Sequence, residues 1–340
     1  DTPVEAIAIT GTSVSNGTLE FSINGTDFNP VGSVSASQSL LLDVADKLRF
    51  RPNADFFGSG GSFTFRAWDQ RSITGSSTAA TANVATGTKV DTSTNGGTSE
   101  FSSNERTANI AVTSINDAPV LRTNGGKLTG GGGNAFGTAN FTSILEDEPN
   151  VSNTGDAVST FLDAAAATDV ELGNGNQGGT ITGSFPTGVA ITFADNTNGT
   201  WQFSTNGTTF NTLNPAVNES TSVLLDGADA NHKIRFVPNA NFNGTATIKY
   251  RAWDGSDGSA VGSNANTSSN GGSTPFSAGL VTKEITVTAV NDAPTLALDA
   301  SNAGLTVNED PGARSVASFI TTATKGGGSD ENSQTLTFAL

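Results

Sequence analysis

The sequence predicts an all-β protein built from antiparallel β-sandwiches. Short segments of alternating apolar and polar residues recur along the chain, separated by turns rich in Asn, Gly, Ser and Asp. Asn-Gly pairs at 16–17, 24–25, 198–199 and 206–207 are strong signals for tight hairpins. Most of this pattern occurs twice within the 340 residues, which indicates a tandem repeat.

The repeat consists of five pairs of matching segments. Residues 18–29 match 200–211, 48–57 match 234–243, 63–70 match 248–255, 91–102 match 266–277, and 110–121 match 285–296. The first repeat has about eleven additional residues between Asp69 and Asp91. We therefore expect about two periods, with both ends of the chain inside a repeat. The predicted domains are 1–118, 119–293 and 294–340.

The strand that ends in Arg-Ala-Trp-Asp alternates in both repeats. Residues 63, 65 and 67 fall on one face of the first strand and 64, 66 and 68 on the other, and 248–253 repeat this pattern. We expect Asp69 and Asp254 to continue the inward face at the tip of each sandwich. On the outward face, Arg66 with Trp68 predicts a cation–π pair, or an aromatic platform for a glycan or a neighbouring chain. Residues 251 and 253 repeat this combination.

Two further segments have irregular composition. Residues 157–167 fit a helix and a strand about equally well, and the glycine-rich stretch 124–137 predicts a flexible surface loop. Residues 173–178 match a dinucleotide-binding fingerprint, but the neighbouring strand and helix that such a site needs are not predicted. His232 lies in an inserted turn, where we expect a solvated side chain.

Composition excludes several classes of function. The chain has no Cys and one His, so thiolate metal sites and cysteine nucleophiles are impossible, and a histidine-based hydrolase has one candidate residue. The net charge of −16 disfavours nucleic acids and anionic membranes as partners and favours a divalent cation. No apolar run is long enough to span a membrane, and no signal peptide opens the sequence. Carboxylate pairs occur without a cleft signature, so we expect no enzyme.

The segments that close each period, VTSINDAPVL and VTAVNDAPTL, resemble those of cadherin-like repeats in large bacterial surface and secreted adhesin-type proteins. The RPNADF and FRAWD blocks are typical of the same repeats. The resemblance covers nearly the whole chain. It implies Greek-key, Ig-like β-sandwich domains joined end to end, with Ca²⁺ between neighbours.

The resemblance also implies a set of calcium ligands, which are Asp or Glu side chains and linker Asn residues. The first junction takes Asn116, Asp117, Asp169, Glu171 and Asp254, and the second takes Glu146, Asn291, Asp292 and Asp330 with Glu331 or Asn332. Asp69 would serve a junction upstream and Glu309 one downstream. The D-R-E triplet of such repeats is not recognisable, and the linker reads N-D-A-P without the full D-x-N-D-N motif. Ca²⁺ prefers oxygen ligands of these types.

The function implied is a structural or adhesive segment of an extracellular array on a bacterial surface or in a biofilm matrix. Its partners would be neighbouring repeats or identical subunits. One alternative is a self-assembling filament in which a strand of one subunit completes the next. A second is a module that binds a glycan or a surface protein. The absence of Cys and Met suits an oxidising, exposed location.

Overall fold

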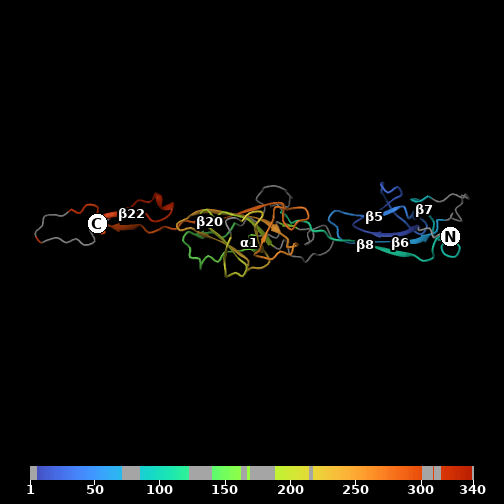
Figure 1. Cartoon of the computed structure of the whole chain (residues 1–340), viewed down its shortest axis with the longest axis horizontal. Coiled ribbons are helices and arrows are strands. Elements are labelled where there is room, and N and C mark those ends of the chain that lie inside the picture. The colour runs from blue at the N-terminus through green and yellow to red at the C-terminus, as the bar shows by residue number, and fades with distance from the viewer. Residues whose placement is uncertain are drawn as a thin grey trace. The chain divides into compact units, whose positions relative to one another are not determined.

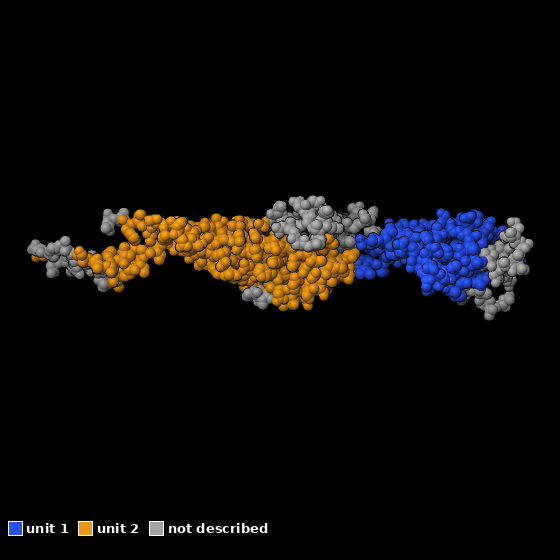
Figure 2. Space-filling view, turned by 90° about the horizontal axis from the view of Figure 1, so that it is seen from above, with its two compact units in different colours: residues 1–115, 176–178 blue, residues 116–175, 179–340 orange. Residues whose placement is uncertain are grey.

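The computed structural model describes residues 6–70, 85–121, 140–161, 167–168, 188–213, 217–300, 309 and 315–338. The chain divides into unit 1, residues 1–115 with 176–178, and unit 2, which contains the remaining residues (Figure 2). Strands in mainly antiparallel sheets are the dominant regular structure of both units, and the described helices are short, which confirms the all-β prediction (Figure 1). The predicted loop 124–137 and the fingerprint 173–178 lie outside the described residues.

Unit 1 has two antiparallel sheets. The first has the order β7-β4-β1-β6-β8 and consists of β1 (Ala6–Val14), β4 (Ser39–Asp43), β6 (Gly58–Trp68), β7 (Lys89–Val90) and β8 (Arg106–Val112). The second has the order β3-β2-β5 and consists of β2 (Gly17–Ser22), β3 (Asn29–Pro30) and β5 (Lys47–Pro52). Labels for several of these strands appear in Figure 1.

Unit 2 has the same arrangement with additional strands. Its first sheet has the order β10-β20-β18-β13-β16-β19, formed by β10 (Ile144–Leu145), β13 (Gly188–Ala194), β16 (Ser222–Asp226), β18 (Gly244–Trp253), β19 (Asn264–Ala265) and β20 (Val281–Thr288). Its second sheet has the order β11-β17-β14-β15, formed by β11 (Asp156–Ala157), β14 (Gly199–Ser204), β15 (Asn211–Thr212) and β17 (Lys233–Pro238). The pairing of β10 with β20 is parallel.

Within the described residues, two short antiparallel ladders and two short helices complete unit 2. β9 (Val120–Leu121) pairs with β12 (Ala167–Thr168), and β21 (Thr295–Leu298) pairs with β22 (Ile320–Thr324). The helices are α1 (Val158–Phe161) and a 3-10 helix, Asp330–Ser333. The segment 157–167 thus contains the end of a strand, one helical turn and the start of another strand.

The internal repeat predicted from sequence is present in the pairing of the strands. Trp68 ends β6 opposite Ala6, and Trp253 ends β18 opposite Gly188. The pairing of β1 with β6 shifts register between Ile9 and Gly11, and the pairing of β13 with β18 shifts at the corresponding place. Phe50 and Phe236 also occupy equivalent strands, opposite residues 19 and 201. The predicted equivalence of these motif residues is therefore confirmed.

Two of the Asn-Gly pairs form the expected hairpins, between β2 and β3 and between β14 and β15. The Asn24 side-chain oxygen accepts the backbone N–H groups of residues 26 and 27, at 3.0 and 2.8 Å. Asn206 makes the same two contacts with residues 208 and 209. Gly25 and Gly207 adopt φ of +80° and +76°, a conformation that glycine adopts without steric cost.

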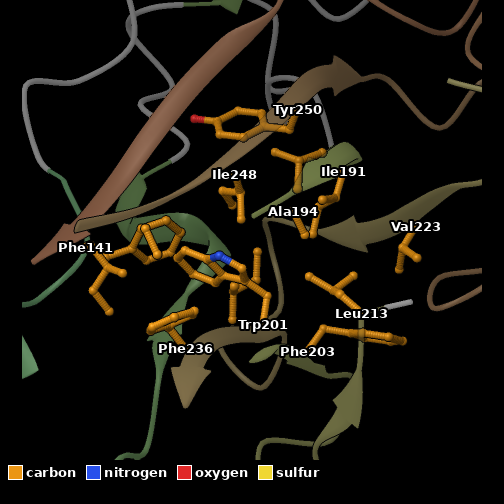
Figure 3. Packing of buried hydrophobic residues seen from close by; sticks show 14 of the residues in the cluster. Phe141, Ile191, Ala194, Trp201, Phe203, Leu213, Val223, Phe236, Ile248 and Tyr250 are labelled. Carbon is orange, nitrogen blue, oxygen red and sulfur yellow. The ribbon is translucent and has the colours of Figure 1, made fainter. Parts of the chain in front are cut away.

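The core of unit 2 lies between its two sheets and contains twenty buried residues. Trp201 of β14 is fully buried, and its ring centroid lies 5.1 Å from that of Phe141 and 5.2 Å from that of Phe236. Figure 3 shows the Trp201 ring between these two phenylalanine rings. Phe141 precedes β10, so a segment outside the central strands supplies part of this core.

The prediction that Trp68 and Trp253 lie on an outward, solvated face is wrong. Both side chains are only 3% exposed. Trp68 packs with Phe101, and Trp253 with Phe276, because the segment that follows each strand folds back over that face of the sheet. Neither of these described positions therefore offers an exposed aromatic platform.

Arginine does stack on aromatic rings, but at other positions. The Arg49 guanidinium lies 3.6 Å from the centroid of Phe28, and that of Arg235 lies 3.9 Å from Phe210. His232 also differs from expectation, because it is 4% exposed and its Nδ1 accepts the backbone N–H of Asp226 at 2.9 Å.

Arg251 and Arg66 occupy equivalent positions but differ in their partners. The Arg251 guanidinium donates two hydrogen bonds to the Glu219 carboxylate, at 3.0 and 2.8 Å. In unit 1 the residue equivalent to Glu219 is Ala36, since both backbone carbonyls accept the N–H of a matching threonine. The Nε of Arg66 is buried and has no partner. Among the described residues, Arg66 therefore has no carboxylate partner such as the one that Arg251 has.

We predict that Glu219→Ala lowers the free energy of unfolding of unit 2 by about 1.5–3 kcal/mol, the range for hydrogen bonds to charged groups. Ala36→Glu has the opposite sign and stabilises unit 1, because it gives Arg66 its missing acceptor. Hydrogen exchange followed by mass spectrometry, which separates the two units by their peptides, measures both changes. Destabilisation of unit 1 by Ala36→Glu would contradict the inferred equivalence.

Candidate functional site

The candidate site is a group of acidic and amide side chains at one end of unit 2. Glu146 follows β10 directly, and the parallel pairing of β10 with β20 fixes its position. Its backbone N–H donates to Thr288 O at 2.9 Å, and its Oε1 accepts the N–H of Val290 at 2.6 Å. The side chain is 2% exposed, so its charge is held away from bulk water.

The turn between β17 and β18 places an amide in the middle of this group. The Asn243 Nδ2 donates to Glu146 Oε2 at 3.0 Å and to Asp330 Oδ1 at 2.8 Å. One amide nitrogen therefore bridges two carboxylates that belong to distant parts of the sequence. The neighbouring Asn241 adopts φ of +58°, and its N–H donates to Asp147 Oδ1 at 3.0 Å, which anchors the turn.

Asp292 of the linker meets Glu331 of the 3-10 helix. The Asp292 backbone N–H donates to Glu331 Oε1 at 2.9 Å. The Glu331 side chain is 2% exposed, and its second oxygen is buried without a hydrogen-bond partner. Asp292 Oδ2 is likewise buried and unpartnered. Two carboxylate oxygens that need a partner thus lie in adjoining side chains, and such groups are costly in a folded protein.

Glycines allow the chain to approach this group closely. Gly326 has φ of +121°, and a Cβ there would lie 2.7 Å from the Asp292 side chain. A Cβ on Gly328 would lie 2.5 Å from Asp330 Oδ1. The run of three glycines before Ser329 therefore permits the backbone to bring Asp330 and Glu331 against the linker.

A second, smaller group joins the first linker to unit 2. The Asn116 Nδ2 donates to Asp254 Oδ2 at 3.1 Å and to Thr274 O at 3.2 Å. Asp254 is 7% exposed, and its Oδ1 accepts the N–H of Ser256 at 2.7 Å. Burial raises the pKa of Asp254, while the bonds from residues 256 and 116 oppose this and the charge of Asp257 adds to it.

The structure brings together some of the predicted ligands and not others. Glu146, Asp292 and Asp330 converge, and Asn116 joins Asp254, while Asp117 of the same linker is half-buried. Asn291 accepts a hydrogen bond from Gln334 at 2.9 Å and is exposed. Asp69 and Glu309 are exposed, unlike the buried Asp254. Asp169 and Glu171 lie outside the described residues, so their roles stay predictions.

Sequence reasoning missed Asn243, whose amide bridges Glu146 and Asp330. The position is Phe57 in the first repeat, so the two repeats do not share this residue. The only available signal was an Asn in the loop between two predicted strands, and this chain has many such residues. Glu331 was an alternative ligand, and its burial makes it one of the central members of the group.

Within the described residues, no three Asp, Glu or His side chains lie close enough together to form a ready-made metal site. Among the same residues, no helix is long and apolar enough to cross a membrane. No protein-family model, curated protein or solved structure matches the chain. The inferences below therefore depend on the residues and contacts described above.

We predict that Glu331→Gln strengthens the contact between the 3-10 helix and the linker when no cation is present. The amide retains an acceptor for the Asp292 N–H and removes one of two adjoining negative charges, whose repulsion is about 1 kcal/mol in water. Exchange of the Asp292 amide hydrogen, measured by NMR in the presence of a chelator, should slow by about fivefold if this repulsion is relieved. Faster exchange in the variant would contradict the inferred repulsion.

We predict that Asp254→Asn changes the pH dependence of stability. Because the pKa of folded Asp254 is raised above its ordinary value of 3.8, the wild-type free energy of unfolding should fall as the pH rises through that raised pKa. The contribution is fully present below pH 3.8. The variant should lack this decline. Denaturant unfolding of both proteins across this pH range measures the difference, and parallel curves would contradict it.

Proposed function

We propose that this chain is a structural segment of an extracellular, cadherin-like repeat array that Ca²⁺ stabilises at its repeat junctions. The observation that carries the proposal is a pair of buried carboxylate oxygens without partners, on Asp292 and Glu331, next to the Asn243 amide that links Glu146 with Asp330. The acidic side chains come from three separate parts of the sequence. A cation that holds them together would tie the start of the next repeat to unit 2.

The chemistry of the group fits Ca²⁺ better than a transition metal. All its side-chain ligands are carboxylate and amide oxygens, which suit a hard cation with six to eight ligands. The Asn243 Nδ2 lies between two carboxylates and donates a hydrogen bond to each, which partly offsets their negative charge as a cation would. Rotation of this amide by about 180° would point its oxygen into the group, as calcium coordination requires.

The acidity of the chain supports the same role. The net charge is −16, and four acidic residues lie at one end of unit 2, two of them buried, so their charges repel one another unless a cation intervenes. The ligands of one ion would belong to the linker and to the two segments that the linker joins. Binding of the ion would therefore make the junction stiffer. We place such an array outside the cell, where free Ca²⁺ reaches millimolar levels and weak sites suffice.

A structural role agrees with the surroundings of the group. Its members lie at the end of the sheets and hold chain segments together, and the described contacts include no nucleophile activated by a base. The glycan-binding alternative loses its main motivation, because the Trp68 and Trp253 side chains are buried. We therefore propose no catalysis and no aromatic sugar platform at these positions.

We predict that calorimetric titration of the whole chain detects Ca²⁺ binding with a dissociation constant near 10⁻⁴–10⁻³ M. Glu146→Gln combined with Asp292→Asn should weaken binding at least tenfold, because two charged ligands are lost. Asn243→Asp should tighten binding and, in chelator, destabilise the contact between 241–243 and 326–331. This opposite response with and without Ca²⁺ separates a cation site from a purely structural contact.

Glu284→Gln provides the matched control for this titration. It removes the same charge from an exposed position on β20, outside the acidic group, and should leave binding unchanged. Absence of binding into the millimolar range would refute the calcium proposal. Equal loss of affinity in the control would show that net charge, and not this group, governs binding.

A further inference from the structure

The two Asn-Gly hairpins surround their asparagine side chain with the same contacts. In unit 1, Asn24 Oδ1 accepts the backbone N–H groups two and three residues further along the chain, at 3.0 and 2.8 Å. In unit 2, Asn206 Oδ1 accepts the corresponding groups at the same two distances. The hydroxyl of the threonine two residues on also donates to each oxygen, at 3.1 and 3.2 Å. Several donors therefore converge on one side-chain oxygen in both repeats.

A buried serine connects each asparagine with the glycine that follows it. Ser22 Oγ accepts the Gly25 N–H at 2.9 Å and donates to Asn24 Oδ1 at 3.1 Å. Ser204 makes the same two contacts in unit 2, at 2.9 and 3.1 Å. Both serine residues are fully buried, while both asparagine residues are exposed. One hydroxyl thus lies between the backbone nitrogen of the glycine and the side-chain oxygen of the asparagine.

These are the groups between which an asparagine can be modified without an enzyme. The backbone nitrogen of the next residue attacks the side-chain carbonyl carbon, a C–N bond forms, and the amide nitrogen leaves as ammonia. Water then opens the resulting succinimide ring at either carbonyl, which gives aspartate or isoaspartate. Glycine as the next residue favours the attack, because it has no Cβ to hinder the approach. The attack requires that the backbone nitrogen lose its proton while charge develops on the side-chain oxygen.

The serine and the converging donors meet both requirements. The Gly25 N–H points at Ser22 Oγ, so its proton can pass to the serine oxygen while the serine hydroxyl proton passes to Asn24 Oδ1. The backbone N–H groups stabilise that oxygen as its charge develops, as in an oxyanion hole. The proton then moves from the oxygen to the amide nitrogen, the C–N bond to that nitrogen breaks, and ammonia leaves.

Two further Asn-Gly pairs, 95–96 and 270–271, occupy equivalent places in the two repeats and have different contacts. In both pairs the glycine N–H donates to a backbone carbonyl, at 2.7 and 2.8 Å. A carbonyl oxygen has no proton of its own to pass on. The asparagine Nδ2 of each pair also donates to two backbone carbonyls, so the amide is held through its nitrogen. These pairs provide a reference within the same molecule.

We infer that Asn24 and Asn206 are sites of self-catalysed modification, at which the neighbouring serine promotes conversion to aspartate and isoaspartate. Water is the co-reactant, and ammonia is released. All the groups that react or stabilise charge lie within residues 22–27 and 204–209. The inference goes beyond the proposed structural role and requires no Ca²⁺.

The consequence of the modification differs between the units. Asn24 Nδ2 donates to Asp27 Oδ2 at 2.7 Å. After conversion to aspartate an oxygen replaces this nitrogen, so that two carboxylates repel each other across the turn. The equivalent of Asp27 in unit 2 is Thr209, which is uncharged. Conversion should therefore speed hydrogen exchange in 17–30 more than in 199–212, and Asp27→Thr should remove this difference.

The test incubates the whole chain at neutral pH, folded and in denaturant, and follows each pair by peptide mapping with mass spectrometry. In the folded chain, Asn24 and Asn206 should react at least as fast as in denaturant. Asn95 and Asn270 should react about tenfold more slowly than in denaturant, because their contacts hold the reacting groups apart. Isoaspartate should be among the products, since direct hydrolysis of the amide gives only aspartate. Slower reaction of Asn24 and Asn206 in the folded chain would overturn the inference.

Ser22→Ala measures the contribution of the hydroxyl. It should slow the reaction of Asn24 about tenfold in the folded chain and leave the rate in denaturant unchanged. Asn206 in the same molecule is the matched control and should keep its wild-type rate, while Ser204→Ala should give the reverse pattern. Ser22→Thr retains a hydroxyl and should restore most of the rate. An unchanged or faster reaction of Asn24 in folded Ser22→Ala would overturn the inference, because the serine would then have only a structural role.

Discussion

The parallel pairing of β10 with β20 is the interaction on which most of unit 2 depends. It holds residues 141–146 along the sheet, so that Phe141 enters the core against Trp201. It also carries Glu146 to the end of the sheet, where the acidic group forms. The same strand pairing therefore completes the core of unit 2 and positions the acidic group. A change that loosens this pairing would alter both. Unit 1 shows what the same arrangement looks like when the described residues lack that strand.

The two units reach a similar arrangement with different polar contacts. Arg251 has the Glu219 carboxylate, while among the described residues Arg66 has backbone carbonyl acceptors and an Nε without a partner. In unit 1, Glu20 instead lies between Arg49 and Arg51, which lower its pKa through hydrogen bonds. Charged pairs are thus redistributed between repeats, whereas the backbone pairing and the buried serine–threonine contact at 39–92 and 222–267 are retained. The backbone framework tolerates such exchange because its hydrogen bonds do not depend on side chains.

Much of the fold was predictable because its signals are local. Alternation, Asn-Gly hairpins and the repeated blocks are all properties of neighbouring residues, and they identified the strands and the equivalent positions. The orientation of Trp68 was not predictable in this way, because alternation defines two faces but not which one a distant segment covers. Asn243 was missed since its role depends on Glu146 and Asp330, which are far away in sequence. His232 became buried for a similar reason, because its ring fills a turn and accepts a backbone N–H.

The direction of β10 relative to β20 also affects how unit 2 bears a mechanical load. Along the chain, β10 is the first strand of the two main sheets of unit 2 and β20 is the last. Because the two strands run parallel, a pull on the two ends slides them past each other, and all the hydrogen bonds between them must break together. An antiparallel pair loaded at adjacent ends opens one bond at a time and resists less force. The pairing of β10 with β20 would therefore resist such a pull in shear, as the proposed structural role requires.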